Sequence, residues 1–351
     1  MSKRILVIGP IAPPLGGVSM HISRLIKLLN NDFDFDFIDE SRNCKPEYFN
    51  IRSLKFYTYF TKIKNAQLIY IHSGKMSLRI FHIVSGKIFR KKIILTIHSF
   101  TANKSKITRI FNQLFYKLAD KIILVNPDIK KYLFLPQKKT IIKEAFIPPS
   151  LEEEDHLPQN IQDLVSDNRK NGNIIICSNA SRLDQYNNED LYGLDLCIEV
   201  SRRLLFRKIP FFFIYVVSSM EKNADLFFKT KDLINKLGLA QNFFFTSQSL
   251  SFVKLIEISD IVLRPTNTDG DSLTVREAIF LNKLVLASDV TKRPNGVYLF
   301  RTRDIDDYES KLVQLINLNL SKDLSKELKK DFIATSKQDY KNFYLSLLKH
   351  T

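Results

Sequence analysis

The stretch Thr268–Ala278 constrains the fold of this chain more than any other segment. A strand-like run, Asp260–Pro265, precedes it, and a second one, Leu284–Asp289, follows it. Between them lie an acidic glycine turn and the start of a helix. This order is how an α/β domain presents backbone N–H groups to an anion at the carboxyl edge of its sheet. The carboxylates of Asp269 and Glu277 suit neighbouring hydroxyls, so the pattern predicts a ligand that carries both phosphates and hydroxyls.

The same residues also have a purely structural interpretation. Thr274-x-x-Glu277 matches a capping box, in which a hydroxyl and a carboxylate satisfy the free N–H groups at a helix start. Asp269-Gly270 is a common turn pair. The flanking strands favour a ligand contact over this alternative.

Length and composition point to two folded domains. A chain of 351 residues is too long to fold around one typical core, and its hydrophobic fraction of 44% is ordinary for a folded soluble protein. Its longest apolar run, Ile209–Val217, is far shorter than the roughly 20 residues that span a bilayer. No signal peptide is recognisable at the N-terminus. The three cysteines, Cys44, Cys177 and Cys197, lack metal-binding spacing, so we expect free thiols in a reducing cytosol.

The net charge of +16 is concentrated in the first half of the chain. Residues 1–150 hold 26 basic against 9 acidic residues, whereas residues 151–351 hold 27 against 28. This asymmetry indicates a polyanionic partner for the first half: a membrane surface, a nucleic acid or a phosphorylated substrate.

Two series of strand-like segments alternate with helix-like ones, which predicts parallel sheets with right-handed crossovers. A polar, acidic stretch between Pro148 and Gly172 separates the series and is expected to connect two domains. From about Ser321 the tail is expected to be helical. The expected strands are Arg4–Ile8, Ala66–His72, Lys92–His98 and Lys121–Val125, then Asn173–Cys177, Phe211–Val217, Asn242–Thr246, Asp260–Arg264 and Leu284–Ser288.

The segment Asp269-Gly270-Asp271-Ser272-Leu273, followed by Glu277-Ala278, resembles the signature of the family 4 glycosyltransferases. In that family two glutamates stand eight positions apart around a Gly-Phe-Gly-Leu turn. Here Asp269 replaces the first glutamate, Asp271 replaces the phenylalanine, and Ser272 replaces the second glycine. The shorter carboxylate bears on the identity and orientation of the donor sugar.

The resemblance implies the GT-B fold: two facing Rossmann-like domains with a central cleft. The first, an acceptor-side domain, would comprise residues 1–155. The second, residues 170–334, would bind the nucleotide-sugar. A C-terminal helix, about 335–351, would cross back to the first domain, because Tyr340 to Leu348 has the aromatic and leucine spacing to pack there.

In the first half, the resemblance points to a glycine loop and a histidine. Gly16-Gly17, after the first strand, would face the donor phosphates and the acceptor, and glycine lets backbone approach a ligand closely. The loop lacks the Gly-x-Gly-x-x-Gly fingerprint of dinucleotide-binding proteins. His98, at a strand end, would hydrogen-bond near the transferred sugar, and His72, also at a strand end, ranks below it.

In the second half, two arginines are candidates for the donor diphosphate. Arg182 follows Ser178-Asn179-Ala180-Ser181 and matches the family's arginine that clamps the pyrophosphate. The family's lysine, which would stand just before Gly193, is replaced by Tyr192. Arg264 is a candidate substitute for that cation, and a surface ion pair with a nearby acid is the alternative.

Catalysis in such an enzyme is electrostatic. Arg182, the amides of Ser272, Leu273 and Thr274, and the dipole of the helix that begins there would stabilise the charge that grows on the departing diphosphate. Asp269 and Asp271 also form an Asp-x-Asp pair, which is a possible metal site. Because the family is metal-independent at this step, we expect no metal and no cofactor besides a UDP-sugar or GDP-sugar donor.

The resemblance therefore predicts a retaining hexosyltransferase of cell-surface polysaccharide synthesis, and we expect its saccharide acceptor to be lipid-linked. Basic aromatic segments, Arg52–Lys64, Arg90–Lys92 and Lys104–Lys121, suit the inner face of an anionic membrane, which predicts a cytoplasmic, peripheral location. The alternatives are a GT-B nucleotide-sugar epimerase and a basic nucleic-acid-binding protein. No nucleic-acid motif is recognisable in the sequence.

Overall fold

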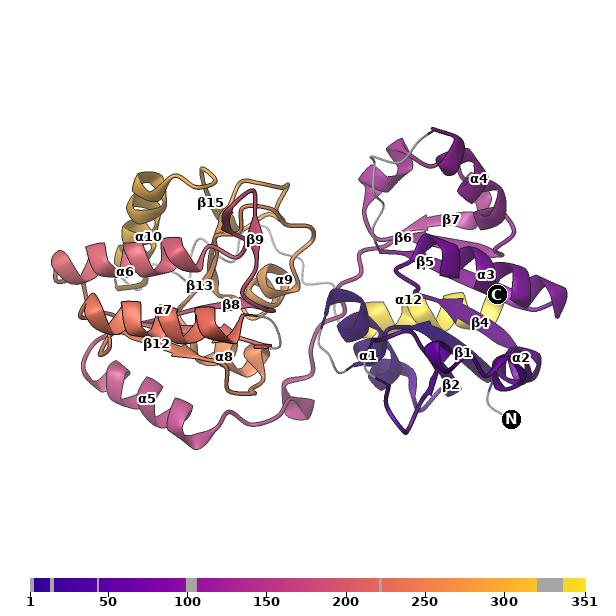
Figure 1. The fold of residues 1–351 in the computed structure, drawn as a ribbon, viewed down its shortest axis with the longest axis horizontal. Helices are drawn as coiled ribbons and strands as arrows, with labels where there is room; N and C mark the ends of the chain where they lie inside the picture. The colour runs from indigo at the N-terminus through magenta and orange to yellow at the C-terminus, as the bar shows by residue number, and fades with distance from the viewer. Residues whose placement is uncertain (1–2, 13–15, 43, 99–105, 221–222, 321–336) are drawn as a thin grey trace. The chain divides into compact units, whose positions relative to one another are not determined.

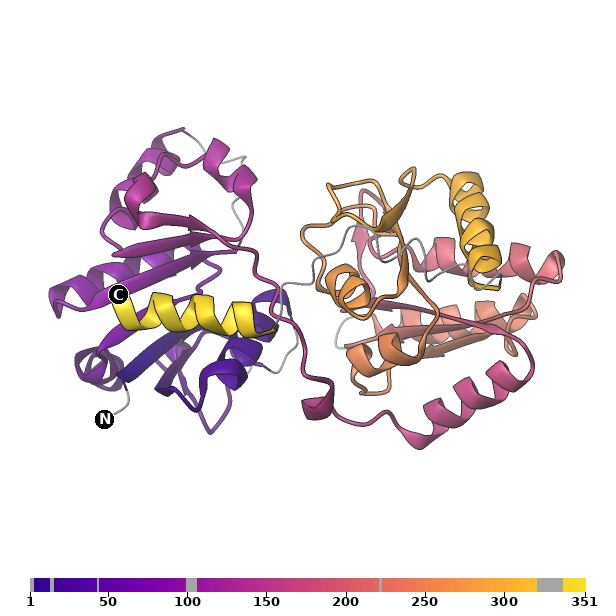
Figure 2. The same cartoon turned by 180° about the vertical axis from the view of Figure 1, so that it is seen from behind.

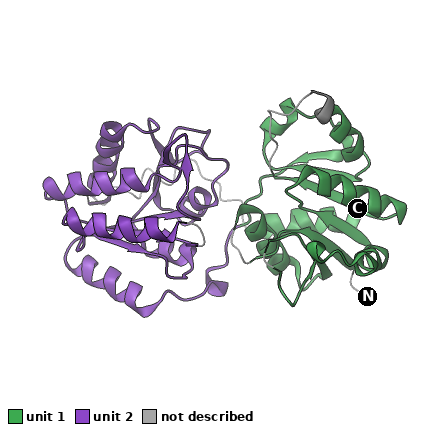
Figure 3. Ribbon diagram, viewed as in Figure 1, with its two compact units in different colours: residues 1–147, 335–351 green, residues 148–334 purple. Residues whose placement is uncertain are grey.

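The computed structural model describes residues 3–12, 16–42, 44–98, 106–220, 223–320 and 337–351. The chain divides into two compact units (Figure 3), Met1–Ile147 with Thr335–Thr351, and Pro148–Ala334. Each unit is built around its own parallel sheet (Figure 1).

The sheet of the first unit has seven strands in the order β3-β2-β1-β4-β5-β6-β7. Its strands are β1 (Lys3–Gly9), β2 (Phe33–Asp39), β3 (Phe49–Asn50), β4 (Leu68–Ile71), β5 (Lys92–Ile97), β6 (Lys121–Leu124) and β7 (Thr140–Ile142). All pair in parallel. The central strands β1 and β4 consist mostly of aliphatic residues because both of their faces are buried.

Helices cover both faces of this first sheet. One core joins strand residues to α2 (Phe56–Asn65), α3 (Met76–Ile88) and α4 (Lys106–Tyr116). On the other face α1 (Gly17–Leu29) packs with α12 (Lys337–His350) (Figure 2).

The last helix belongs to the first unit, as expected for the fold. Tyr344 is 1% exposed, and its ring lies 6.2 Å from that of His21 on α1. Lys3 Nζ donates to the Leu348 carbonyl at 2.8 Å, and Lys341 pairs with Asp32. The prediction of a helical tail also covers residues 321–336, which lie outside the described part of the chain.

The sheet of the second unit has six strands in the order β12-β11-β8-β13-β14-β15. They are β8 (Ile174–Ala180), β11 (Phe211–Val217), β12 (Phe243–Thr246), β13 (Ile261–Arg264), β14 (Leu284–Ser288) and β15 (Val297–Phe300). A small hairpin, β9 (Gln185–Tyr186) with β10 (Glu189–Asp190), stands apart from this sheet. Alternate residues of β8 point into two different cores, Ile174 and Ile176 into one and Ile175 and Cys177 into the other.

Three helices cover each face of the second sheet. The larger core includes α6 (Leu194–Phe206), α7 (Ala224–Lys236) and α10 (Ile305–Leu320). The opposite core includes α5 (Gln159–Lys170), α8 (Phe252–Ile258) and α9 (Leu273–Phe280).

The stretch between Pro148 and Gly172 is only partly the connection that its polar composition predicts. Helix α5 lies within it and buries Ile161 and Val165 in the second unit's core. The prediction was wrong for this helix because only its narrow apolar stripe is buried, while its polar face dominates the composition.

We expect the packing of α12 to stabilise the first unit directly. Replacing Tyr344 by alanine removes a fully buried ring and should lower the free energy of unfolding by about 3–5 kcal/mol. Urea denaturation followed by circular dichroism measures this, with Asn342→Ala, an exposed position on the same helix, as the control. Equal effects of the two substitutions would show that α12 is not docked.

Candidate functional site

The candidate residues lie where the strand order of each sheet reverses. In the first unit β2 and β3 lie on one side of β1, whereas β4 and the strands that follow it lie on the other side. In the second unit the same reversal falls between β8 and β13. At such a switch point the connections after neighbouring strands run to opposite faces and leave room for a ligand at the carboxyl edge. Gly16, Gly17 and His72 follow the strands of the first reversal, and Arg182 and Asp269 follow those of the second.

The start of α9 is capped by Ser272, and its N-terminal amides point toward the carboxyl edge of the second sheet. Ser272 Oγ accepts from the Val275 N–H at 3.4 Å, so Ser272 caps the helix and the structural alternative of a capping box between Thr274 and Glu277 does not hold. Thr274 instead donates its hydroxyl to Asn179 Oδ1 at 3.0 Å. This bond joins the first turn of α9, which begins at Leu273, to the end of β8.

Asp269 is held between two arginines. Arg264, the last residue of β13, donates from Nε and Nη2 to the two carboxylate oxygens at 3.0 and 3.2 Å. Arg293 donates from Nη1 to Asp269 Oδ2 at 2.8 Å. All three side chains are at most 12% exposed. The alternative of an ion pair between Arg264 and a nearby acid is therefore right about the partner type but wrong about the location, because the pair is buried.

This arrangement fixes the charge of the carboxylate. Burial raises the pKa of Asp269, but the charges of Arg264 and Arg293 outweigh that effect and leave the pKa below its ordinary value. Burial likewise lowers the pKa of Arg264, and Asp269 more than compensates, so the guanidinium stays charged. One carboxylate thus faces two guanidinium groups. Arg264 also lies 5.2 Å from the ring of Tyr192, in cation–π range.

The other predicted donor-site residues surround this group. Arg182 is half-exposed and donates from Nε to Asp184 at 2.7 Å. The Gly270 N–H donates to Asp269 Oδ1 at 3.0 Å. Asp271 accepts from Arg276, so each carboxylate of the Asp-x-Asp pair faces an arginine rather than the other carboxylate. Glu277 lies within α9 and is 6% exposed.

A close backbone approach positions the loop that contains Asp269. Gly193 has φ +70°, and a Cβ atom there would lie 2.1 Å from the Pro265 carbonyl oxygen. Only glycine combines that backbone conformation with that contact. The glycine after Tyr192 therefore serves the packing of the loop that follows β13.

In the first unit the glycine loop has open space around it. Gly16 caps α1 with extended backbone, and its N–H donates to Ser19 Oγ at 2.9 Å. A Cβ on Gly17 would meet no atom within 4 Å. Neither glycine is required by a left-handed backbone, so what they provide is accessible main chain.

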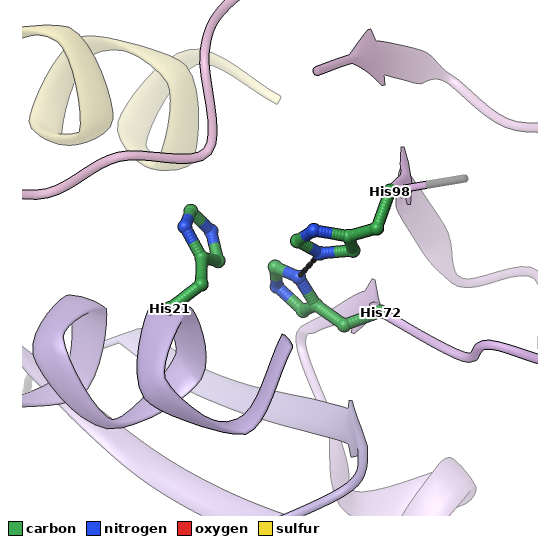
Figure 4. A group of neighbouring side chains, drawn as sticks. All are labelled: His21, His72 and His98. Atoms are coloured by element: carbon green, nitrogen blue, oxygen red, sulfur yellow. Dashed lines mark hydrogen bonds between the residues drawn. The ribbon is translucent and has the colours of Figure 1, made fainter. Parts of the chain in front are cut away.

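His98 belongs to a cluster of three imidazoles (Figure 4). His72 follows β4, His98 follows β5, and His21 lies on α1; His72 Nδ1 and His98 Nε2 share a hydrogen bond of 3.0 Å. Burial lowers the pKa of His21 to about 4, and it also holds the pKa values of His72 and His98 well below the ordinary value. All three rings are therefore neutral at pH 7.

Sequence reasoning missed Arg293, Asn179 and His21. Arg264 ends β13, and Arg293 follows the neighbouring strand β14. A basic residue after each of two neighbouring strands was therefore the signal in the sequence that could have identified Arg293. Asn179 stands at a strand end beside Arg182. His21 gave no signal, because in the sequence it is one polar residue on an amphipathic helix.

A cavity of about 700 Å³ lies elsewhere in the second unit. It is lined by Arg169, Lys254, Asp260 and Lys283 among others. Asp260 and Lys283 precede β13 and β14, so the cavity lies at the amino edge of the sheet, opposite the candidate residues.

We expect the pairing of Asp269 to be a large contribution to folding. Asp269→Asn leaves two buried guanidinium groups without their counter-charge and should cost about 3–5 kcal/mol in chemical denaturation. Asp271→Asn breaks one partly exposed pair and should cost within about 1 kcal/mol. Equal costs for both substitutions would contradict a buried network.

The same network predicts a dependence of stability on pH. Because the folded-state pKa of Asp269 is depressed, its stabilisation is fully present above the ordinary carboxyl value of 3.8 and is lost as the pH falls through the folded-state pKa. The stability difference between wild type and Asp269→Asn should therefore shrink in acid below that value, as measured by urea denaturation across pH.

Neither a family model nor a curated protein sequence matches this chain. Solved structures do resemble it over nearly its whole length. HepE from Anabaena, solved with UDP, has a TM-score of 0.70 at 12% identity, covering 99% of this chain and 100% of its own. A glycosyltransferase from Rickettsia africae has a TM-score of 0.71 at 16% identity, covering 99% and 98%. Sucrose-phosphate synthase from Thermosynechococcus elongatus has 0.67 at 13%, covering 99% and 100%. These are GT-B glycosyltransferases, and the chain has the GT-B fold, as its sequence predicts.

Proposed function

We propose that this chain is a retaining glycosyltransferase that moves a hexose-type sugar from a nucleoside-diphosphate sugar to a saccharide acceptor. One observation carries the proposal: Arg182, Arg264 and the capped start of α9 gather at the carboxyl ends of β8 and β13. Two guanidinium groups and a helix N-terminus are complementary to a diphosphate.

The chemistry follows from where negative charge develops. As the glycosidic bond to the nucleotide breaks, charge grows on the diphosphate oxygens. The N–H groups of Ser272, Leu273 and Thr274, the α9 dipole and Arg182 then stabilise it more strongly than in the ground state. The protein's own cations supply this charge, so the proposed step needs no divalent metal.

Asp269 acts in this proposal through its neighbours. Its two arginine partners occupy both carboxylate oxygens. The side chain therefore positions Arg264 toward the leaving diphosphate. Asp271 and Gly270 shape the turn before α9. Glu277 lies one helical turn into α9, and we assign it to binding the nucleotide-sugar.

The first unit supplies the acceptor side. His98 stands at the end of β5, and because burial lowers its pKa well below the ordinary value, its imidazole is a weak base that suits a hydrogen bond to a sugar hydroxyl better than proton abstraction. The accessible backbone of Gly16 and Gly17 suits a phosphate or a sugar that approaches the start of α1.

The nucleotide is proposed by analogy. HepE has been solved with UDP and with UDP-glucose, which makes UDP-sugars the first donors to test. GDP-sugars remain the alternative. The proposed phosphate-binding residues do not determine which base is bound, because the base would contact other parts of the second unit.

An exposed apolar surface on the first unit supports a lipid-linked acceptor. Ile110, Phe111 and Leu114 on α4 are 53–60% exposed, and Phe134 is 79% exposed. Gln113 Nε2 donates to the Tyr132 carbonyl at 3.4 Å, which places the loop before Phe134 beside α4. We call these four side chains the α4 patch.

The residues around the α4 patch are basic. Lys117, Lys121, Lys130 and Lys138 lie in the same part of the chain, and none of the four forms an ion pair with another described residue. Exposed aromatic and aliphatic side chains bordered by lysines suit the headgroup region of an anionic bilayer. No helix in the described ranges is long and apolar enough to cross a membrane. We therefore propose a peripheral association with the cytoplasmic face of the membrane, in polysaccharide assembly.

Donor binding is the first test of this function. A thermal-shift panel of UDP, GDP, ADP and their sugars, run with and without magnesium, should show selective stabilisation by one nucleoside diphosphate. A ligand at about 100 times its Kd adds about 2.7 kcal/mol. Arg182→Ala should abolish most of that gain, because the variant loses a phosphate contact.

Arg202→Ala is the matched control, since Arg202 is 47% exposed and Arg182 is 50% exposed, each with a local acidic partner. A gain that depends on magnesium would contradict metal independence, and no gain with any nucleotide would contradict the donor site. Product analysis by NMR then distinguishes a new glycoside with retained configuration from an epimerised nucleotide-sugar.

Membrane association is tested separately by sedimentation with phosphatidylserine vesicles. Wild type should bind at low salt and release as salt screens the lysines. Phe111→Ser with Leu114→Ser should weaken binding about a hundredfold or more, because fully burying such side chains contributes about 1.5–3 kcal/mol each. Phe206→Ser, 86% exposed on the second unit, is the control. Failure of wild type to bind at low salt would remove this part of the proposal.

A further inference from the structure

The three histidines of the first unit form a compact group. The ring centroids of His21, His72 and His98 lie 5.1–5.3 Å apart, and one nitrogen from each ring lies within 4.8 Å of the others. The three come from α1 and from the ends of β4 and β5, with their rings turned toward one another (Figure 4). Three separate elements converge on one point.

Hydrogen bonding leaves two of the ring nitrogens unsatisfied. His21 Nδ1 lies 2.5 Å from the Ala145 carbonyl, which can only accept, so this nitrogen carries the proton. His21 Nε2 is then an unprotonated lone pair. Within the described residues, His21 Nε2 and His72 Nε2 are buried without a hydrogen-bond partner. A buried polar atom left unpaired costs about 1–3 kcal/mol, so this space favours an occupant.

From this geometry we propose that His21, His72 and His98 bind a late transition-metal ion of the Zn²⁺ class. Neutral imidazoles are the ligands that such ions prefer, whereas Mg²⁺ and Ca²⁺ prefer oxygen. His21 would bind through Nε2, and His72 and His98 through one nitrogen each. Three histidines leave a fourth position open to water or to a ligand.

The distances are compatible with such a site after small side-chain rotations. Zn–N bonds of about 2.0–2.1 Å place tetrahedral ligands about 3.4 Å apart. His72 Nδ1 and His98 Nε2 are already 3.0 Å apart. Binding breaks their hydrogen bond, and the shared proton moves to a nitrogen that is not a ligand, so all three rings stay neutral. The Ala145 carbonyl fixes the His21 tautomer, as backbone carbonyls do for metal-binding histidines.

The charged residues around the three histidines limit which metal ions can bind there. Arg24 and Arg79 are the charged residues whose electrostatic effects reach His21 and His98. In the described part of the chain, no carboxylate or thiol joins the group. Two nearby positive charges oppose a cation, so only ions with strong imidazole affinity should bind, and they should favour an anionic fourth ligand.

Metal analysis of the full chain, purified without a histidine tag, tests the proposal. In equilibrium dialysis near neutral pH, wild type should bind a single equivalent of Zn²⁺ at low micromolar free metal, unaffected by excess Mg²⁺. His21→Gln and His98→Gln should each weaken binding at least about tenfold. His156→Gln, an exposed histidine of the second unit, should bind as wild type does.

A spectroscopic measurement on wild type avoids dependence on variants that fold poorly. In ¹⁵N NMR of the imidazoles, Zn²⁺ should shift His21 Nε2 away from its unprotonated position while Nδ1 stays protonated. No stoichiometric binding, equal binding by the His98→Gln variant, or an unchanged His21 signal would each overturn the proposal and leave water as the occupant. These readouts do not require glycosyl transfer, so they stand or fall independently of the proposed function.

Discussion

The strands that carry the candidate residues are buried on both faces, and this constraint determines where chemistry can occur in the molecule. In β8, successive residues enter two different cores, and β4, β5 and β13 are also almost wholly buried. A charged side chain within such a strand would lack solvent and partners. Charged groups are therefore confined to the ends of these strands, and the reversal of strand order brings the ends of particular strands together.

The buried network around Asp269 shows how this sequence departs from the pattern that it resembles. A longer acid in that position has the reach to contact a donor sugar. The shorter aspartate is instead bound by Arg264 and Arg293, so both oxygens are already used. In the function proposed above, the substitution would exchange a contact with the donor sugar for a rigid positive site. Arg293 contributes to this rigidity, since it also donates to the Ser288 carbonyl.

Doubly buried strands are the part of the fold that the sequence predicts best. Phe211–Val217 and Leu284–Ser288 were located to the residue, because continuous apolar runs of that length have few alternatives. β2 was missed although its Phe-Asp alternation is typical of a half-buried strand, and its acids pair with Arg4 and Lys62 in the folded sheet. β7 and β15 are edge strands of three and four residues, so their apolar runs are too short to be recognised as strands.

Some candidate residues that were identified from sequence, such as His98 and Arg264, stand directly at strand ends, where position alone suggests a role. Those that were missed depend on contacts across the fold. Arg293 is 24 residues from Asp269, and their ion pair exists only because β13 and β14 are neighbours. His21 meets His72 and His98 only because α1 packs over the ends of β4 and β5. No local pattern encodes such a meeting. The capping-box alternative at Thr274 fails for a related reason, since the helix is capped by Ser272 and the Thr274 hydroxyl donates to Asn179 of β8.

The return of α12 to the first unit has a consequence for synthesis on the ribosome. All strands and described helices of the second unit precede residue 321, so its core can close while the end of the chain is still unmade. The first unit cannot complete its core until Tyr344 and Leu348 have been synthesised, because these residues are 1% and 0% exposed in the folded unit. Domains usually complete folding from the N-terminus onward during translation. Here we expect the opposite order: the half that is made first, and that carries nearly all of the net positive charge, is the last to become a finished domain.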